Sequence, residues 1–213
     1  MDVPKKKRQQ KRGRERRNHI LKAARELLEE KDLNEISLAD VAARTEVPLS
    51  SLYHFYPNLQ RLLAEMVPQF SAELLEHLHT TSTGFSSDDW QAYVDNVIEN
   101  SATFYRNHPG YQQLILSGKA PDFIKRADRR LDDILVKAIT ARISRKFEIP
   151  DFPERHRVFS YALQIVELAF SLSVIRDGEI KPMAIAEGQR AAKAYLSTYL
   201  PEVLPLRPSD AEA

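Results

Sequence analysis

Two serines, a tyrosine and a histidine lie close together in the segment "PLSSLYHFY", residues 48–56. Small hydroxyl groups let a backbone approach base edges and phosphates, and Tyr and His add hydrogen-bonding groups of longer reach. Core packing requires none of these side chains. Their types and spacing favour a surface that reads DNA, although an ordinary helical hairpin with a polar outer face would show the same pattern.

These side chains need a helix that keeps its opposite face buried. Ser37 is predicted to begin a short helix, with Asp40 in capping-box position, and a tight turn around Thr45–Val47 leads to a second short helix that ends before Pro57. Two such helices bury their apolar faces only against a third, which forms a helix-turn-helix. The third is predicted over residues 15–30, where apolar residues recur at helical spacing: Ile20, Ala24, Leu27 and Leu28.

The second short helix has two predicted faces. Val47, Leu52 and either Phe55 or Tyr56 would point into the core. The outer face, which would enter the major groove, then holds the remaining side chains: Leu49, Ser50, Ser51, Tyr53 and His54.

Composition indicates a soluble globular protein of one large domain or two small ones. Of 213 residues, 43% are hydrophobic and 29% charged, and Cys is absent, which excludes disulfides, thiolate zinc sites and a cysteine nucleophile. No apolar segment follows "MDVPKKKRQQ", and the nearly apolar run Val158–Ile175 is interrupted by Gln164 and Glu167. We therefore expect a cytoplasmic protein without a signal peptide and without a membrane span.

The basic residues are concentrated at the N-terminus. Residues 1–20 hold nine Lys or Arg and two acidic residues, whereas the whole chain has 31 basic and 30 acidic residues, so the rest is net acidic. This asymmetry indicates that one end meets a polyanion, and a merely solvated, disordered tail is the alternative. "PKKKR" is also a weak match to a nuclear localisation signal.

The chain downstream reads as further helices separated by breaks that contain Pro or Gly. No stretch alternates as a strand would. We predict an all-α fold of about nine helices, the later ones over residues 58–79, 88–107, 110–117, 121–148, 153–176 and 182–200. The expected divisions are a disordered basic arm, the helix-turn-helix domain, an effector-binding and dimerisation domain and a flexible tail: 1–14, 15–60, 61–205 and 206–213.

Arg16 to Leu63 resembles the DNA-binding domain of the TetR family of bacterial transcriptional regulators. The resemblance lies in "ILKAARELL", "SLADVA", "LYHFY" and the helix that begins after "PN". It implies a homodimer that places two recognition helices in successive major grooves, about 34–36 Å apart on a palindromic operator. Relief of repression by a ligand is the default mechanism that the resemblance implies, and activation or function without a ligand are the alternatives.

Four positions depart from the family pattern. Glu46 stands where Gly is usual in the turn, Pro48 where Ser often starts the recognition helix, Ser50 where Gly is common, and Leu59 where a Lys usually follows. The basic arm is expected to compensate for that missing lysine. The DNA-contacting residues that we expect are Arg12, Arg14, Arg16, Arg17, Ser37, Thr45, Pro48, Leu49, Ser50, Ser51, Tyr53, His54 and Asn58.

The helix over 153–176 is apolar nearly all round, so it needs burial on two sides. A second copy of the chain, packed through this helix and 182–200, would provide it, and a wholly internal core helix is the alternative. The expected dimer contacts are Phe159, Leu163, Val166, Phe170, Ala191, Ala194, Tyr195 and Thr198.

The resemblance also implies an effector pocket among the helices over 58–79, 88–107 and 121–148. The aromatic and aliphatic candidates could equally be plain core, and Gln164 and Glu167 could pair across the dimer or anchor a ligand. We expect an apolar or amphipathic small molecule, contacted by Met66, Phe70, Phe104, Tyr111, Leu114, Ile115, Phe123, Ile134, Gln164 and Glu167.

The sequence gives no support for an enzyme. It contains no P-loop, dinucleotide-binding turn, HExxH motif or nucleophile elbow, and its six histidines form no ligand set. We expect no cofactor and no metal site. The remaining alternative is a helical adaptor whose basic arm binds RNA or an acidic partner without recognising an operator.

Overall fold

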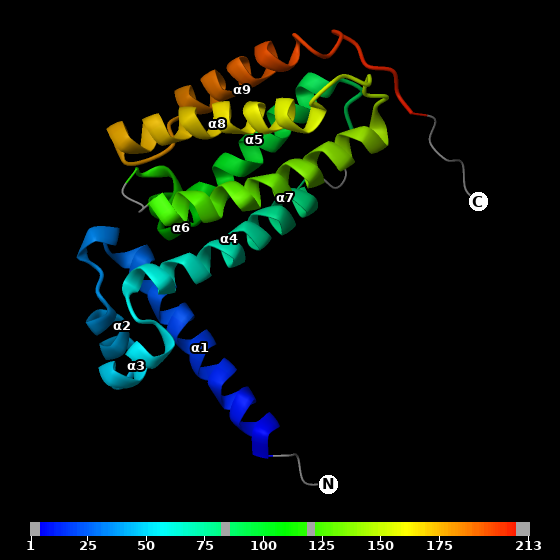
Figure 1. The fold of residues 1–213 in the computed structure, drawn as a ribbon. Helices are drawn as coiled ribbons and strands as arrows, with labels where there is room; N and C mark the ends of the chain where they lie inside the picture. Colours follow the sequence, from blue (N-terminus) through cyan, green and yellow to red (C-terminus); the bar gives the residue numbers. More distant parts are fainter. Residues whose placement is uncertain (1–4, 82–85, 119–121, 208–213) are drawn as a thin grey trace.

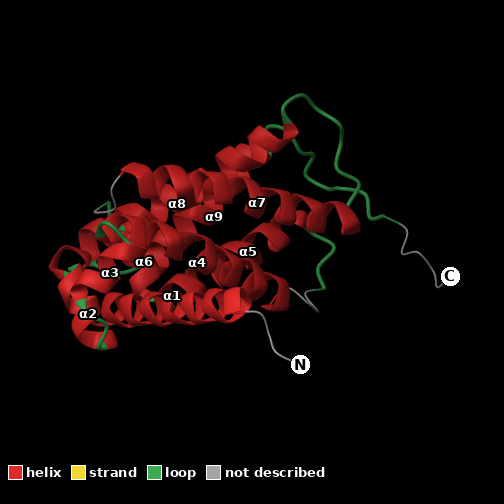
Figure 2. Ribbon diagram, turned by 60° about the horizontal axis from the view of Figure 1, so that its bottom comes forward, coloured by secondary structure: helices red, strands yellow, loops and turns green. Residues whose placement is uncertain are grey.

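The computed structural model describes residues 5–81, 86–118 and 122–207, with side chains except those of 5–10, 122, 123 and 125–130. Phe123 and the tail from residue 208 therefore lie outside the described side chains. The described residues form helices and loops without a strand (Figure 2), as predicted. The nine α-helices among them are α1 (Lys5–Glu30), α2 (Leu38–Thr45), α3 (Leu49–Phe55), α4 (Leu59–Thr81), α5 (Trp90–Asn107), α6 (Pro109–Leu116), α7 (Asp122–Lys146), α8 (Arg155–Asp177) and α9 (Pro182–Leu196).

The basic N-terminal segment is helical rather than disordered. α1 begins at Lys5, ten residues before the predicted start, and its first turns project beyond α2 and α3, away from the rest of the molecule (Figure 1). The segment consists almost entirely of Lys, Arg, Gln and Glu, which are strong helix formers. The expectation of a disordered arm therefore fails from Lys5 onward.

The first three helices form the predicted helix-turn-helix unit. Ser37 caps α2 by the predicted capping box: Ser37 Oγ accepts from the Asp40 N–H at 3.2 Å, and Asp40 Oδ2 accepts from the Ser37 N–H at 2.9 Å. α2 packs on α1 and α3 packs on α2. Their shared core contains Ile20, Ala24, Leu27, Leu28, Leu38, Val41, Leu52 and Tyr56.

α4 connects this unit to the rest of the molecule. Asn58 caps it, because the Arg61 N–H donates to Asn58 Oδ1 at 2.9 Å. The helix packs against α1 near its start and against α5 and α7 further along (Figure 1). A displacement of α4 would therefore change the packing of both the helix-turn-helix unit and the remaining helices.

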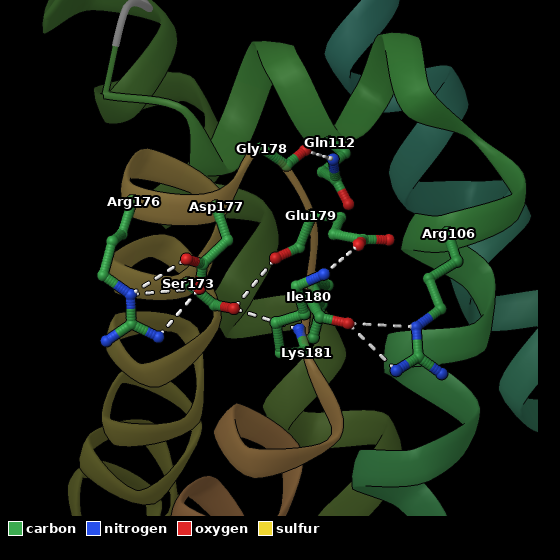
Figure 3. Close-up of polar contacts among 9 residues, drawn as sticks. All are labelled: Arg106, Gln112, Ser173, Arg176, Asp177, Gly178, Glu179, Ile180 and Lys181. Carbon is green, nitrogen blue, oxygen red and sulfur yellow. Dashed lines mark hydrogen bonds and ion pairs between the residues drawn. The ribbon is translucent and has the colours of Figure 1, made fainter.

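α8 and α9 lie side by side at one edge of the molecule (Figure 1). The turn between them is tied to α5 and α6, as Figure 3 shows. Ser173 Oγ donates to the Glu179 carbonyl at 2.8 Å, Arg106 Nη2 donates to the Ile180 carbonyl at 2.9 Å, and Gln112 Nε2 donates to the Gly178 carbonyl at 3.2 Å.

Within the described residues, α8 is the one helix long and apolar enough to meet the length and composition criteria for a membrane span. A core helix of a soluble protein meets the same criteria. The inner face of α8 packs on α7 and α9. This packing agrees with the predicted buried helix.

Candidate nucleic-acid interface and internal cavity

α3 has the two faces that the sequence predicts. Leu52 is fully buried and Tyr56, just after the helix, is 2% exposed, so these residues anchor the helix in the core. Tyr53 is 51% exposed, Leu49 is 38% exposed, and Ser50 and His54 are exposed as well. Ser51 is half-buried. The helix therefore presents hydroxyl, imidazole and apolar groups together on an accessible face.

The turn before α3 adopts the backbone geometry that usually requires glycine. Glu46 ends α2 in the left-handed region with φ 56° and ψ 17°, which is strained for a residue with a Cβ. Pro48 occupies the N-cap position of α3, without a side-chain hydrogen bond and one residue before the first helical turn. Both departures from the family pattern are therefore accommodated by the fold.

The N-terminus of α2 is exposed and already holds one carboxylate. Hydrogen bonds from Ser37 and from Lys31 lower the pKa of Asp40 to about 2, so Asp40 is charged at neutral pH. The capping box uses the N–H groups of Ser37 and Asp40, which leaves those of Leu38 and Ala39 to contact a phosphate.

Two predicted DNA contacts already make contacts within the chain, the buried Thr45 and the exposed Arg17. Thr45 is 6% exposed and its hydroxyl donates to the Val41 carbonyl at 2.8 Å, so it does not reach the outer surface. Arg17 Nε lies 3.5 Å from Glu65 Oε1, and the guanidinium lies 5.8 Å from the centroid of the Tyr56 ring. This arginine joins α1 to α4.

The other predicted cations are accessible. Arg12, Arg14 and Arg16 are exposed, and Arg12 and Arg16 share a face of α1 because they are four residues apart. Arg61, at the start of α4, is an exposed cation that the sequence analysis missed. Its position two residues after Leu59, where the family has a lysine, was the available signal.

Three of the predicted effector contacts, Phe70, Phe104 and Tyr111, belong to a packed aromatic cluster. Phe70 stacks on Tyr111 with ring centroids 4.6 Å apart, and Tyr111 stacks on Tyr105 at 5.4 Å. Met66, Phe70, Phe104, Tyr111 and Leu114 are buried in the core, Ile115 is half-buried, and Ile134 is 50% exposed on α7. The buried side chains among them pack between α4, α5 and α6, the set does not surround one common cavity, and its contact with an effector stays a prediction.

A cavity of about 70 Å³ lies among α4, α5, α7, α8 and α9, which include the three helices expected to enclose an effector pocket. Of the predicted effector residues, Glu167 lines it and Gln164, half-buried on α8, does not. Its walls are almost wholly apolar and include Tyr93, Val97, Tyr105, Leu135, Phe159 and Phe170. Among the residues that the structure describes, no three His, Asp or Glu side chains gather closely enough to hold a metal ion.

The face of α8 that points outward is not the predicted one. Phe159, Val166 and Phe170 are buried within the chain, and Leu163 lines the cavity. The exposed apolar side chains of α8 form a single stripe, with the half-buried Ile165 between the first two: Tyr161, Leu168, Leu172 and Ile175. On α9, the predicted Ala191 and Ala194 are exposed and Tyr195 is half-buried, and Thr198, just after the helix, is exposed.

The helix-turn-helix unit is fastened to the rest of the chain by polar contacts. Arg25 binds Glu73 through two hydrogen bonds, at 2.6 and 2.8 Å, and its guanidinium lies 4.8 Å from the Phe70 ring centroid. On α6, the Gly110 N–H donates to Glu29 Oε2 at 3.0 Å. A Cβ at Gly110 would lie 2.9 Å from that of Leu28, so this close approach requires glycine.

Solved structures of similar fold are regulators. A TetR-family transcriptional regulator from Streptomyces coelicolor is 21% identical, with a TM-score of 0.68 over 87% of this chain and 99% of that chain. Thermus thermophilus FadR, a TetR-family repressor in complex with lauroyl-CoA, is 16% identical, with a TM-score of 0.63 over 92% and 99%. A TetR-family regulator from Pectobacterium atrosepticum is 20% identical, with a TM-score of 0.62 over 89% and 96%. A comparison with curated proteins gives no match.

Family models match both parts of the chain. The model for bacterial regulatory proteins of the tetR family matches residues 20–66. The model for a tetracyclin repressor-like C-terminal domain matches residues 88–200, which alone is more than half of the chain. Regulators of this family are non-enzymatic, DNA-binding proteins that dimerise. The chain therefore belongs to the TetR family of bacterial transcriptional regulators.

Proposed function

We propose that this regulator is a ligand-responsive repressor that binds a palindromic operator as a homodimer. The observation that carries the proposal is the geometry of α3: Leu52 and Tyr56 fix it in the core, while Ser50, Tyr53 and His54 are exposed. A helix held in this way can enter a major groove without disturbing its own packing.

The exposed groups of α3 and its N-cap are of two kinds: groups that form hydrogen bonds with DNA, and apolar groups. Ser50, Ser51, Tyr53 and His54 offer hydrogen bonds to base edges or phosphates. Pro48 and Leu49 offer apolar surface to a thymine methyl group.

Phosphate contacts would surround α3 and fix its register. Asn58 and Arg61 lie at the start of α4, and the N-terminus of α2 at Ser37 directs backbone N–H groups outward. Arg12, Arg14 and Arg16 on the projecting part of α1 add affinity by counterion release without much sequence choice.

In the proposed dimer, α8 and α9 of the two copies pack together. The exposed stripe Tyr161, Leu168, Leu172 and Ile175 has the spacing of a helix–helix seam, and an exposed apolar row of this kind marks an interaction site. Three residues of α9 and one just after it would border the seam: Ala191, Ala194, Tyr195 and Thr198.

The apolar lining of the cavity, not its volume of about 70 Å³, supports an apolar or amphipathic effector, and the lauroyl-CoA complex of Thermus thermophilus FadR is consistent with this class. A ligand relieves repression only if it binds the DNA-competent and incompetent conformations with different affinity, typically by about 1–3 kcal/mol. We place the protein in the cytoplasm, where its operator is.

The test is a mobility-shift and footprinting experiment on the DNA upstream of the gene. The proposal expects a footprint with two-fold symmetry and half-sites one helical turn apart. Binding to RNA or to any duplex with equal affinity would instead support the adaptor alternative.

A further inference from the structure

A groove of about 420 Å³ runs between α4 and α7 over α5. Its floor is apolar and consists of Tyr93, Val97, Leu135 and Ile139. The sides are low because the α4 and α7 residues that flank the floor include exposed alanines: Ala72, Ala138 and Ala141. The volume falls within the range of small-molecule sites.

Two arginines of α7 stand at this groove, and among the described side chains neither has a carboxylate partner. Arg142 and Arg145 are three residues apart and so share one face of the helix. Arg142 Nη1 donates to the His79 carbonyl at 3.2 Å, and neither guanidinium has an acidic side chain within ion-pair distance in the described part of the chain. Neighbouring cations are paired: Lys137 with Asp133, Lys146 with Asp88, and Lys193 with Asp95.

The groove borders the internal cavity across a shared wall. The same four residues, Tyr93, Val97, Leu135 and Ile139, form the floor of the groove and one wall of the cavity. Burial raises the pKa of Tyr93 to about 12, while the positive charges of Arg142 and Arg145 act in the opposite direction. The phenol therefore stays neutral and lies within the field of both arginines.

We propose that the groove binds an amphiphile with one anionic head group, whose head lies on Arg142 and Arg145 and whose apolar tail lies along the groove floor toward the cavity. The effect of this ligand on DNA rests on the proposed function, but its binding does not. Glu76 lies on the α4 side of the groove, and its negative charge repels an anionic head group. The head group therefore lies against α7. A guanidinium pair suits a carboxylate because it offers charge-assisted hydrogen bonds.

The test compares three ligands of equal chain length on the full-length protein: dodecanoate, dodecan-1-ol and dodecyltrimethylammonium, each below its micelle concentration. Binding is measured by calorimetry and by the fluorescence of Trp90, the single tryptophan, which lies on α5 at the start of the same helix as Tyr93. Dodecanoate should bind about tenfold more tightly than the alcohol, and the cation should bind most weakly.

Variants locate the head and the tail separately. The double substitution Arg142→Gln and Arg145→Gln should weaken dodecanoate by about tenfold or more and leave dodecan-1-ol nearly unchanged. The double substitution Arg157→Gln and Arg190→Gln, at exposed positions on α8 and α9, is the charge-matched control and should change neither ligand. Ala138→Phe, which fills the groove from an exposed position, should weaken both ligands.

Equal binding of all three ligands, or tightest binding of the cation, overturns the proposal. So does dodecanoate binding that is unaffected by the arginine double variant. DNA binding of the ligand-free protein is measured in parallel: intact DNA binding without dodecanoate binding refutes the ligand class alone. Dodecanoate binding without any DNA binding refutes the operator-binding function alone.

Discussion

Gln112 and Gln113 are neighbours on α6, and their side chains bind opposite parts of the molecule. Gln112 donates to the Gly178 carbonyl in the α8–α9 turn (Figure 3). Gln113 donates to the carbonyls of Leu28 and Lys31 at 2.8 and 3.0 Å. Its own Oε1 accepts from the Leu33 N–H at 2.8 Å. α6 therefore links the proposed dimerisation helices to the end of α1.

Replacing Gln113 should loosen this link. Gln113→Ala removes three hydrogen bonds and leaves the Leu33 N–H without its partner, so we expect the free energy of unfolding to fall by about 1–3 kcal/mol in urea titrations. The matched control is Gln60→Ala, an exposed position on α4, which should stay within about 0.5 kcal/mol of the parent. If the two substitutions lower the free energy of unfolding equally, the hydrogen bonds of Gln113 do not stabilise the protein.

Relieving the strained turn should stabilise the protein. Glu46 is exposed and left-handed, so Glu46→Gly should raise the free energy of unfolding by about 0.5–1 kcal/mol. Ala43→Gly, on an exposed helical position three residues earlier, should lower it by about 1 kcal/mol. A loss of stability in both variants would mean that residue 46 is not strained in solution.

Charging the apolar stripe of α8 should abolish the dimer. Leu172 is 59% exposed in the single chain, so Leu172→Glu costs little for the fold but buries a carboxylate at the proposed interface. Light scattering should report a monomer. Val203→Glu, at a residue that is 76% exposed and lies beyond α9, is the control and should remain dimeric. A dimeric Leu172→Glu variant would place the interface elsewhere.

The cations of α1 should set the salt dependence of DNA binding. Every arginine that neutralises a phosphate adds about 0.9 to the steepness of log K against log salt, so Arg12→Gln with Arg16→Gln should flatten the slope by up to about 2. Arg157→Gln, on α8 and exposed, should leave the slope unchanged. An unaltered slope in the α1 variant would show that these arginines do not meet phosphates.

The order of the helices could be predicted because their ends carry local signals. The Ser37 capping box, the Asn58 cap and the breaks with Pro or Gly all lie where the structure ends or begins a helix. The two faces of α3 could be predicted as well, because Leu52 is an apolar residue among polar neighbours.

The outward face of α8 could not be predicted in the same way. Apolar residues surround this helix almost completely, so periodicity does not distinguish Phe170, which is buried, from Leu172, which is exposed. The cavity lies among the expected helices α4, α5 and α7, but most of its lining residues could not be predicted. Phe70 and Tyr111 stack on each other, which only the relative placement of α4 and α6 shows.

The helical state of the basic segment was also missed. High net charge suggested disorder, but the residues from Lys5 onward continue a helix that Ile20 and Leu21 anchor in the core. Helix propensity therefore predicts the state of this segment better than its net charge does.

The central claim is that the exposed face of α3 reads the operator, and Tyr53 tests it most directly. Because its ring is 51% exposed, Tyr53→Ala should leave the unfolding transition unchanged while weakening operator binding by about 1–3 kcal/mol in a mobility-shift titration at fixed salt. Binding to a scrambled duplex should change much less. Equal operator affinity of Tyr53→Ala and the parent, with a matching footprint, would contradict the account.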